Sequence, residues 1–223
     1  MRGEKIIIAN IISFLAILLV VYISTISHEL AHGFVAYKLG DPTAKFAGRL
    51  TFNPLKHIDL IGTILLPIML KIAGFIPLII LKPVPINPAF FRNRNIDSIK
   101  VALAGPFINL FYVFITAIII RISLNINTIS NSILFKIFVY YFGIWIIMIN
   151  LILASFNLIP FPPLDGSWVI ISILPLKAKL FYEKIKTYII ILFLVLIVTG
   201  KLNFIFNFLL KFFKSLTLKL IGL

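Results

Sequence analysis

The sequence predicts an all-α polytopic membrane protein, and three observations lead to this fold class. Of its 223 residues, 61% are hydrophobic and 13% are charged, whereas a soluble domain is about half apolar and about a quarter charged. The mean hydropathy is +1.12. Several apolar runs reach the roughly 20 residues that cross a bilayer, and they lie along the whole chain, so a removable signal peptide does not explain them. We expect a bundle of about 4–6 membrane segments.

The apolar segments follow one another with polar connections between them. The second segment, residues 60–81, is interrupted by glycines and prolines and carries Lys71, which predicts a re-entrant or broken segment rather than a simple span. The others are residues 5–38, 98–122, 134–156, 188–199 and 202–223. All 223 residues are expected to form one integral-membrane domain, with its core at about residues 20–175 and C-terminal membrane segments at residues 186–223.

Residues 40–59 form a polar connection after the first segment. Glycine and proline interrupt it, and residues around Ala44 to Phe52 alternate between apolar and polar. This pattern predicts a small β-hairpin within residues 41–58.

The charge pattern excludes some classes of function. The net charge is +14 and the chain has no cysteine, so disulfides and thiolate metal ligands are excluded. The basic residues lie mainly between apolar segments, as in loops that face the cytosol and anionic lipid. No basic amphipathic helix, recognition motif or zinc finger indicates nucleic-acid binding.

Residues 27–32, SHELAH, contain the pattern H-E-x-x-H. On a helix, His28 and His32 project from one face and can bind one Zn²⁺ ion. Glu29 can then take a proton from the attacking water and pass it to a leaving amine. The pattern also arises by chance in soluble helices, but here it interrupts an apolar run, where ionisable groups are costly and usually functional. The sequence therefore predicts a metal site, and zinc, cobalt or iron would suit such ligands.

A catalytic zinc site needs a third protein ligand, and Asp165 is the best placed of the seven acidic residues. It follows a proline-rich stretch directly after a membrane segment, and Gly166 would allow a tight backbone turn. The alternative is that Asp165 caps the short helix that follows. The residue pattern alone leaves both roles open.

Other polar residues have weaker assignments. His57 and Asp59 lie in the polar connection and could be surface residues, partners of a metal ligand or substrate contacts. Asn157 could donate to a developing oxyanion, or, like Asn109, hydrogen-bond between helices. Gly105 and Pro106 indicate a close helix approach and a local kink.

Three motifs in order, SHELAH, AGPFIN at residues 104–109 and NLIPFPPLDG at residues 157–166, resemble those of the site-2 protease family of intramembrane zinc metalloproteases. GRLTFNPLKHIDLIGT and KPVPIN are similar to its compact prokaryotic branch, which lacks PDZ and CBS domains. The resemblance covers roughly residues 20–175. It implies one zinc ion held by His28, His32 and Asp165, with Glu29 as catalytic acid and base and Asn157 binding substrate or stabilising the oxyanion.

The expected function is hydrolysis of peptide bonds within or near transmembrane helices of membrane-protein substrates. The hairpin would clamp an unwound substrate by β-augmentation. The site would face the cytosolic side of a prokaryotic plasma membrane, because the connections nearest to it are basic. The alternatives are a membrane metal-ion transporter and a non-catalytic homologue. A transporter would need intramembrane polar residues on several helices, whereas this chain shows one compact cluster and a distant aspartate.

Overall fold

Long apolar helices dominate the computed structural model, which describes residues 2–65, 68–69, 72, 81–126, 129, 131–201 and 203–222. Three stretches are long and apolar enough to cross a membrane, namely Asn10–Lys38, Arg94–Leu124 and Ile133–Asn157. They belong to α1 (Arg2–Lys38), to α4 (Arg94–Leu124), and to a run formed by α6 (Ile133–Phe138), the π-helical η4 (Val139–Gly143) and α7 (Ile144–Asn157). The predicted helical membrane fold is confirmed at this level.

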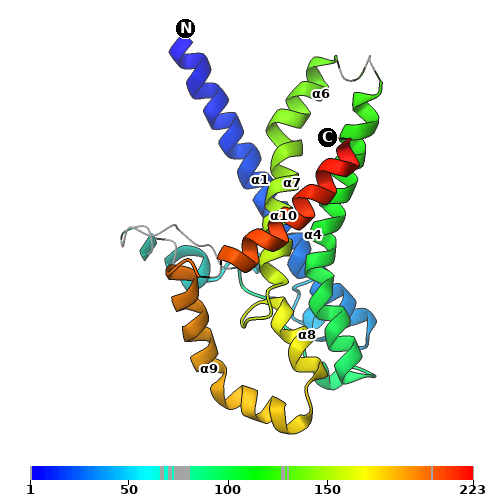
Figure 1. The fold of residues 1–223 in the computed structure, drawn as a ribbon, viewed down its shortest axis with the longest axis vertical. Coiled ribbons are helices and arrows are strands. Elements are labelled where there is room, and N and C mark those ends of the chain that lie inside the picture. The colour runs from blue at the N-terminus through cyan, green and yellow to red at the C-terminus, as the bar shows by residue number, and fades with distance from the viewer. Residues whose placement is uncertain are drawn as a thin grey trace.

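Helices α1, α4 and α7 run side by side along the long axis of the molecule (Figure 1). Helix α4 is antiparallel to α1, because His28 contacts Asn109 and the later His32 contacts the earlier Val101. Lys38 and Arg94, the end of α1 and the start of α4, therefore lie at the same end of the bundle.

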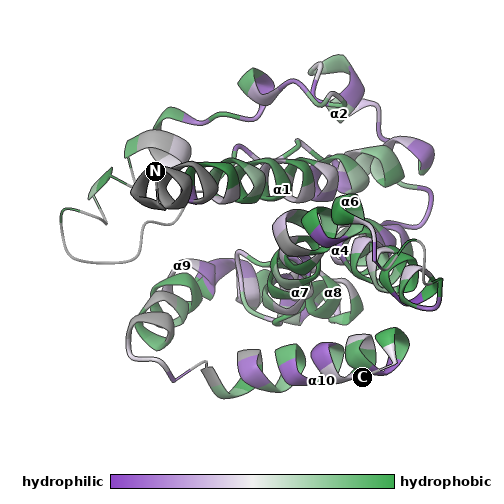
Figure 2. Ribbon diagram, turned by 90° about the horizontal axis from the view of Figure 1, so that it is seen from above, coloured by the Kyte–Doolittle hydropathy of each residue, from purple (hydrophilic) through white to green (hydrophobic). Residues whose placement is uncertain are grey.

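The outer surfaces of these helices are apolar, which accounts for the composition. Phe14 on α1 is 60% exposed and Phe107 on α4 is 70% exposed. The ribbons of α1, α4 and α7 are mostly hydrophobic when seen from above, whereas α10 alternates between hydrophilic and hydrophobic residues (Figure 2). Side chains such as Phe14 and Phe107 suit contact with lipid rather than with water.

Three helices follow the spans: α8 (Asp165–Ile173), α9 (Leu176–Val198) and α10 (Asn203–Ile221). Helix α10 crosses α4 and α7 obliquely (Figure 1). Phe193 of α9 is buried against Ile159 and Leu164 and stacks on Phe161 at 5.7 Å between ring centroids. The C-terminal helices thus pack on the loop that leads into α8.

The predicted hairpin at residues 41–58 is wrong. This segment contains a single helical turn, α2 (Thr43–Phe46), and the 3₁₀ turn η1 (Pro54–Lys56), and no strand. Asp41 accepts a hydrogen bond from the Thr43 N–H at 2.9 Å, which favours a helical turn at this point. Later in the segment, His57 Nε2 bonds the Thr51 carbonyl at 2.8 Å. Side-chain bonds to the backbone and local turns take the place of the ladder that two paired strands would need.

The predicted re-entrant segment, residues 60–81, lies largely outside the described residues. Its first part is the π-helical η2 (Leu60–Leu65). The residues that flank it are close together, since the Lys82 N–H donates to the His57 carbonyl at 2.9 Å.

Candidate metal centre

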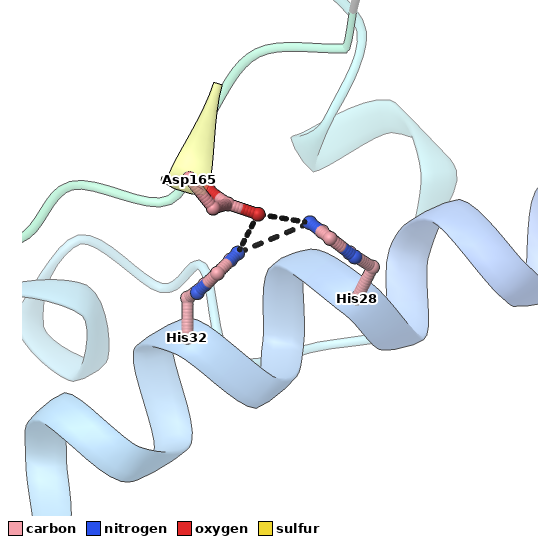
Figure 3. A group of neighbouring side chains, drawn as sticks. All are labelled: His28, His32 and Asp165. Atoms are coloured by element: carbon pink, nitrogen blue, oxygen red, sulfur yellow. Dashed lines mark hydrogen bonds and ion pairs between the residues drawn. The ribbon is translucent and has the colours of Figure 1, made fainter. Parts of the chain in front are cut away.

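His28 and His32 of α1 and Asp165 of α8 bring three ligand atoms together (Figure 3). Asp165 Oδ2 lies 3.0 Å from His28 Nε2 and 3.2 Å from His32 Nε2, and the two nitrogens are 3.1 Å apart. The histidine side chains are 8% and 9% exposed and the Asp165 side chain is 19% exposed. This is the group that the family resemblance implies, although His28 and Asp165 are 137 residues apart in the chain.

The triangle has the dimensions of one face of a tetrahedral metal site. With metal–ligand bonds of about 2.0–2.1 Å, tetrahedral ligand atoms lie about 3.3–3.4 Å apart. The three separations are only slightly shorter. A small outward shift of the ligand atoms would therefore allow the three atoms to hold one ion and leave a fourth position for water or substrate.

Helix α4 fixes the orientation of both imidazole rings. His28 Nδ1 donates to Asn109 Oδ1 at 2.6 Å, and His32 Nδ1 donates to the Val101 carbonyl at 2.7 Å. In the neutral form of each ring the proton then lies on Nδ1, so each Nε2 can offer a lone pair to an ion at the centre of the triangle.

Gly105 of α4 forms a wall of the site. A Cβ atom at this position would lie 2.4 Å from His32 Nε2 and 2.5 Å from His28 Nε2. The close helix approach predicted for Gly105 is confirmed, and it occurs at the ligand atoms themselves. Pro106, the next residue, lacks the N–H that would bond the carbonyl of Ala102.

Asp165 is the first residue of α8, and it does not cap that helix. The N-cap position belongs to Leu164, and no side-chain cap is present. Gly166 does not adopt the left-handed backbone conformation. Its hydrogen instead faces the preceding loop, where a Cβ would lie 2.5 Å from the Leu158 carbonyl oxygen and 2.6 Å from that of Ile159. Close backbone packing at Gly166 is therefore what sets Asp165 in place.

The Asp165 carboxyl, which lies outside the three candidate spans, is held in its ionised form. Burial raises its pKa, but the hydrogen bonds with His28 and His32 outweigh burial and lower the pKa to about 2. A carboxylate beside two imidazoles is a donor set that suits a divalent cation, which would bind in place of any proton held on the Nε2 atoms.

Glu29 follows His28 on α1 and is half-buried. Its Oε2 accepts a hydrogen bond from the Val84 N–H at 2.9 Å. The KPVPIN segment thus lies against the helix next to the ligands. Gly33 permits this, because a Cβ there would lie 2.7 Å from a Val84 methyl group.

The other predicted residues lie outside the triangle. Asn157 Nδ2 donates to the Leu153 carbonyl within α7 at 3.0 Å. His57 is fully buried, and the one described hydrogen bond of its side chain joins it to Thr51. Asp59 accepts from the Gly62 N–H at 2.7 Å at the start of η2. No hydrogen bond among the described residues joins any of them to a predicted ligand.

Sequence reasoning missed Asn150. It is fully buried on α7 and hydrogen-bonds Asn109. The signal was available, because an amide in the middle of an apolar membrane segment needs a buried partner. The pattern of residues did not reveal which partner it has.

Comparison with known proteins identifies the family of this chain. The family model for Peptidase family M50 matches residues 121–200. The protein named "Putative zinc metalloprotease YwhC" of Bacillus subtilis (strain 168) is 39% identical over 190 residues, which are 85% of this chain and 82% of that protein. No solved structure is significantly similar. The chain therefore belongs to peptidase family M50, the site-2 protease family that its motifs predict, and is a metalloprotease.

Proposed function

We propose that this protein is an intramembrane zinc metalloprotease that hydrolyses peptide bonds within or near transmembrane helices of membrane-protein substrates. The observation that carries the proposal is the position of the three ligand atoms. Two of them come from the candidate span Asn10–Lys38, and the third comes from α8, a helix that packs against the span Arg94–Leu124.

The depth of the site supports a substrate in the membrane. His28 lies about ten residues before Lys38, or about 15 Å along the helix axis, and about 27 Å from Asn10. A scissile bond that reaches this depth belongs to a segment that is itself within the bilayer.

In this proposal His28, His32 and Asp165 hold one zinc ion, which when bound polarises a carbonyl group and activates a water molecule. Their spacing and the fixed Nδ1 bonds of the two histidines support the assignment. The name of the Bacillus relative, a zinc metalloprotease, agrees with it.

Glu29 is proposed as the general base and then the general acid. Its Oε2 is fixed by the Val84 N–H, so Oε1 remains to take a proton from the attacking water and deliver it to the leaving amine. The bond from Val84 restricts the carboxylate to one orientation while leaving it half-exposed.

Asn157 is proposed to steady the oxyanion. It ends α7, eight residues before Asp165. One hydrogen of its amide is used by Leu153, and the second is left to donate to a substrate oxygen.

We further propose that the site faces the cytosolic side of a prokaryotic plasma membrane. The connections at the end of the bundle that holds Lys38 and Arg94 are rich in lysine and arginine, as cytosolic loops are. The loop at residues 123–135 has neither.

The test is cleavage of a membrane-protein substrate by the purified protein in liposomes. Glu29→Gln keeps an oxygen that accepts from Val84 but cannot take a proton, so cleavage is expected to fall by about 10²–10⁴-fold while zinc content stays unchanged. Lys45→Gln, an exposed change on α2, serves as the matched control and should retain activity. Equal cleavage by wild type and Glu29→Gln would contradict the assigned role.

A further inference from the structure

A chain of three buried polar side chains links α7 to the metal centre. Asn150 on α7 is fully buried and accepts a hydrogen bond at its Oδ1 from Asn109 Nδ2 at 2.7 Å. Asn109, also fully buried, accepts from His28 Nδ1 at 2.6 Å. Asn150 Nδ2 donates to Ser24 Oγ on α1 at 2.9 Å. The chain thus begins and ends on α1 and passes through α4 and α7.

Asn150, the amide farther from the metal centre, decides which group donates and which accepts in each of these hydrogen bonds. Asn150 Nδ2 also donates to the Ile146 carbonyl at 2.8 Å, and a carbonyl can only accept. The amide of Asn150 must therefore turn its oxygen toward Asn109. Asn109 must in turn offer its nitrogen to Asn150 and its oxygen to His28.

The consequence reaches the ligand atom. Because Asn109 Oδ1 can only accept, the proton of the neutral His28 ring must lie on Nδ1, and the Nε2 lone pair points to the metal position. His32 obtains the same tautomer locally, from the Val101 carbonyl of α4. Only His28 depends on a residue of a third helix.

We propose that Asn150 is a positioning residue for the metal centre, acting through Asn109 to fix the tautomer and orientation of His28. The inference rests on the proposed function, in which His28 binds zinc. Both asparagines use their side-chain oxygen and both amide hydrogens in hydrogen bonds. The second amide hydrogen of Asn109 is donated to the Ser24 carbonyl at 3.4 Å. No polar group of the two amides is therefore left unsatisfied. In an apolar interior such a network has one favourable arrangement, because any reversal buries unpaired groups.

Helix association alone is the other role that a buried asparagine can have, and the two roles predict different results for zinc. In Asn150→Leu, Asn109 loses the acceptor that holds its amide, so His28 can rotate. Zinc affinity, measured by competition with a chelator, is expected to fall about tenfold. The visible absorption of bound Co²⁺, which reports coordination geometry, is expected to change as well.

The conservative variant separates positioning from packing. Asn150→Asp keeps an oxygen for Asn109 and, protonated in its buried site, can still donate to Ser24 or Ile146. Its zinc affinity should lie within about threefold of wild type, whereas Asn150→Leu, which removes the acceptor of Asn109, should lose about tenfold. Ser155→Ala is the matched control, because Ser155 is equally buried on α7 and its hydroxyl has no hydrogen-bond partner in the described part of the chain. It should leave both readouts unchanged.

The positioning role would be overturned if Asn150→Leu bound zinc with wild-type affinity, or if Asn150→Leu and Asn150→Asp lost zinc affinity equally. Neither result would affect the proposed function, since the wild type would still bind zinc and cleave its substrate. A wild type without zinc would overturn the proposed function instead, and this inference with it. If Asn150→Leu does not fold, Asn150→Ala removes the same oxygen and is read in the same way.

Discussion

At the scale of single residues, the absence of a side chain at Gly105 matters as much as the ligands do. The space that its Cβ would fill is bounded by the Nε2 atoms of His28 and His32. Those atoms cannot withdraw, because Asn109 and the Val101 carbonyl hold the opposite side of each ring. Helix α4 therefore both orients the histidines and leaves room for an ion.

Gly105→Ala is expected to weaken zinc binding by at least about tenfold, because the added methyl group overlaps the ligand atoms. The helix itself should persist, since alanine favours helix more than glycine does. Chelator competition measures the affinity and circular dichroism the helix content.

Gly143→Ala gives the control for this change. Its Cβ would lie 3.3 Å from the flexible end of Ile120 and far from the ligands, so zinc affinity should stay at the wild-type value. Undiminished zinc binding by Gly105→Ala would show that the ligand geometry differs from the one described here.

The residue pattern was sufficient to predict His28 and His32 as a pair, because their spacing alone places both on one helix face. Asp165 needed the family resemblance, since its position after a proline-rich loop suited a helix cap equally well. Asn150 could not be assigned from the sequence, because its role depends on which residue α4 places opposite it.

At the scale of elements, the loop before α8 is what delivers the third ligand. The backbone carbonyls of Leu158 and Ile159 lie against Gly166, and Phe193 of α9 covers the other side of Ile159 and Leu164. The position of Asp165 is thus fixed from both sides by packing.

Gly166→Ala is expected to displace the start of α8, because its Cβ would meet backbone atoms, which cannot rotate away. Asp165 would then leave the triangle, and zinc affinity should fall at least about tenfold. Ser172→Ala near the end of α8 is the control and should bind zinc as wild type does. Equal zinc affinities for Gly166→Ala and wild type would argue against this packing role.

The long helices were predictable from apolar run length, which depends only on local sequence. The hairpin prediction failed because alternation over residues 44–52 is short, and two other features competed with it. Asp41 stabilises a helical turn at Thr43, and Gly48 adopts a φ of +62° that ends the turn. A strand pair would have needed partner strands that this connection does not supply.

At the scale of the whole molecule, the topology follows from the antiparallel packing of α1 and α4. Lys38 and Arg94 lie at one end of the bundle, and the Lys82 N–H bonds the His57 carbonyl. The residues on either side of the segment at residues 60–81 therefore lie close together. This closeness is compatible with the re-entrant or broken segment that the sequence predicts, which stays a prediction because most of residues 60–81 lie outside the described residues.

The chain has no cysteine, which makes single-cysteine labelling a direct test of the topology. In intact cells, an impermeant thiol reagent should label a cysteine at Asn131, in the loop after α4. It should label Arg92→Cys only after the cells are opened. Labelling of Arg92→Cys from outside would place the basic connection on the wrong side and contradict the proposed orientation.

The most direct test of the metal centre is the zinc content of the detergent-purified protein for wild type, Asp165→Ala and His57→Ala. We expect about one zinc per chain in wild type and in His57→Ala, and loss of zinc in Asp165→Ala, since two histidines alone bind the ion too weakly. Zinc that is kept by Asp165→Ala and lost from His57→Ala would contradict the three-ligand site at the centre of this account.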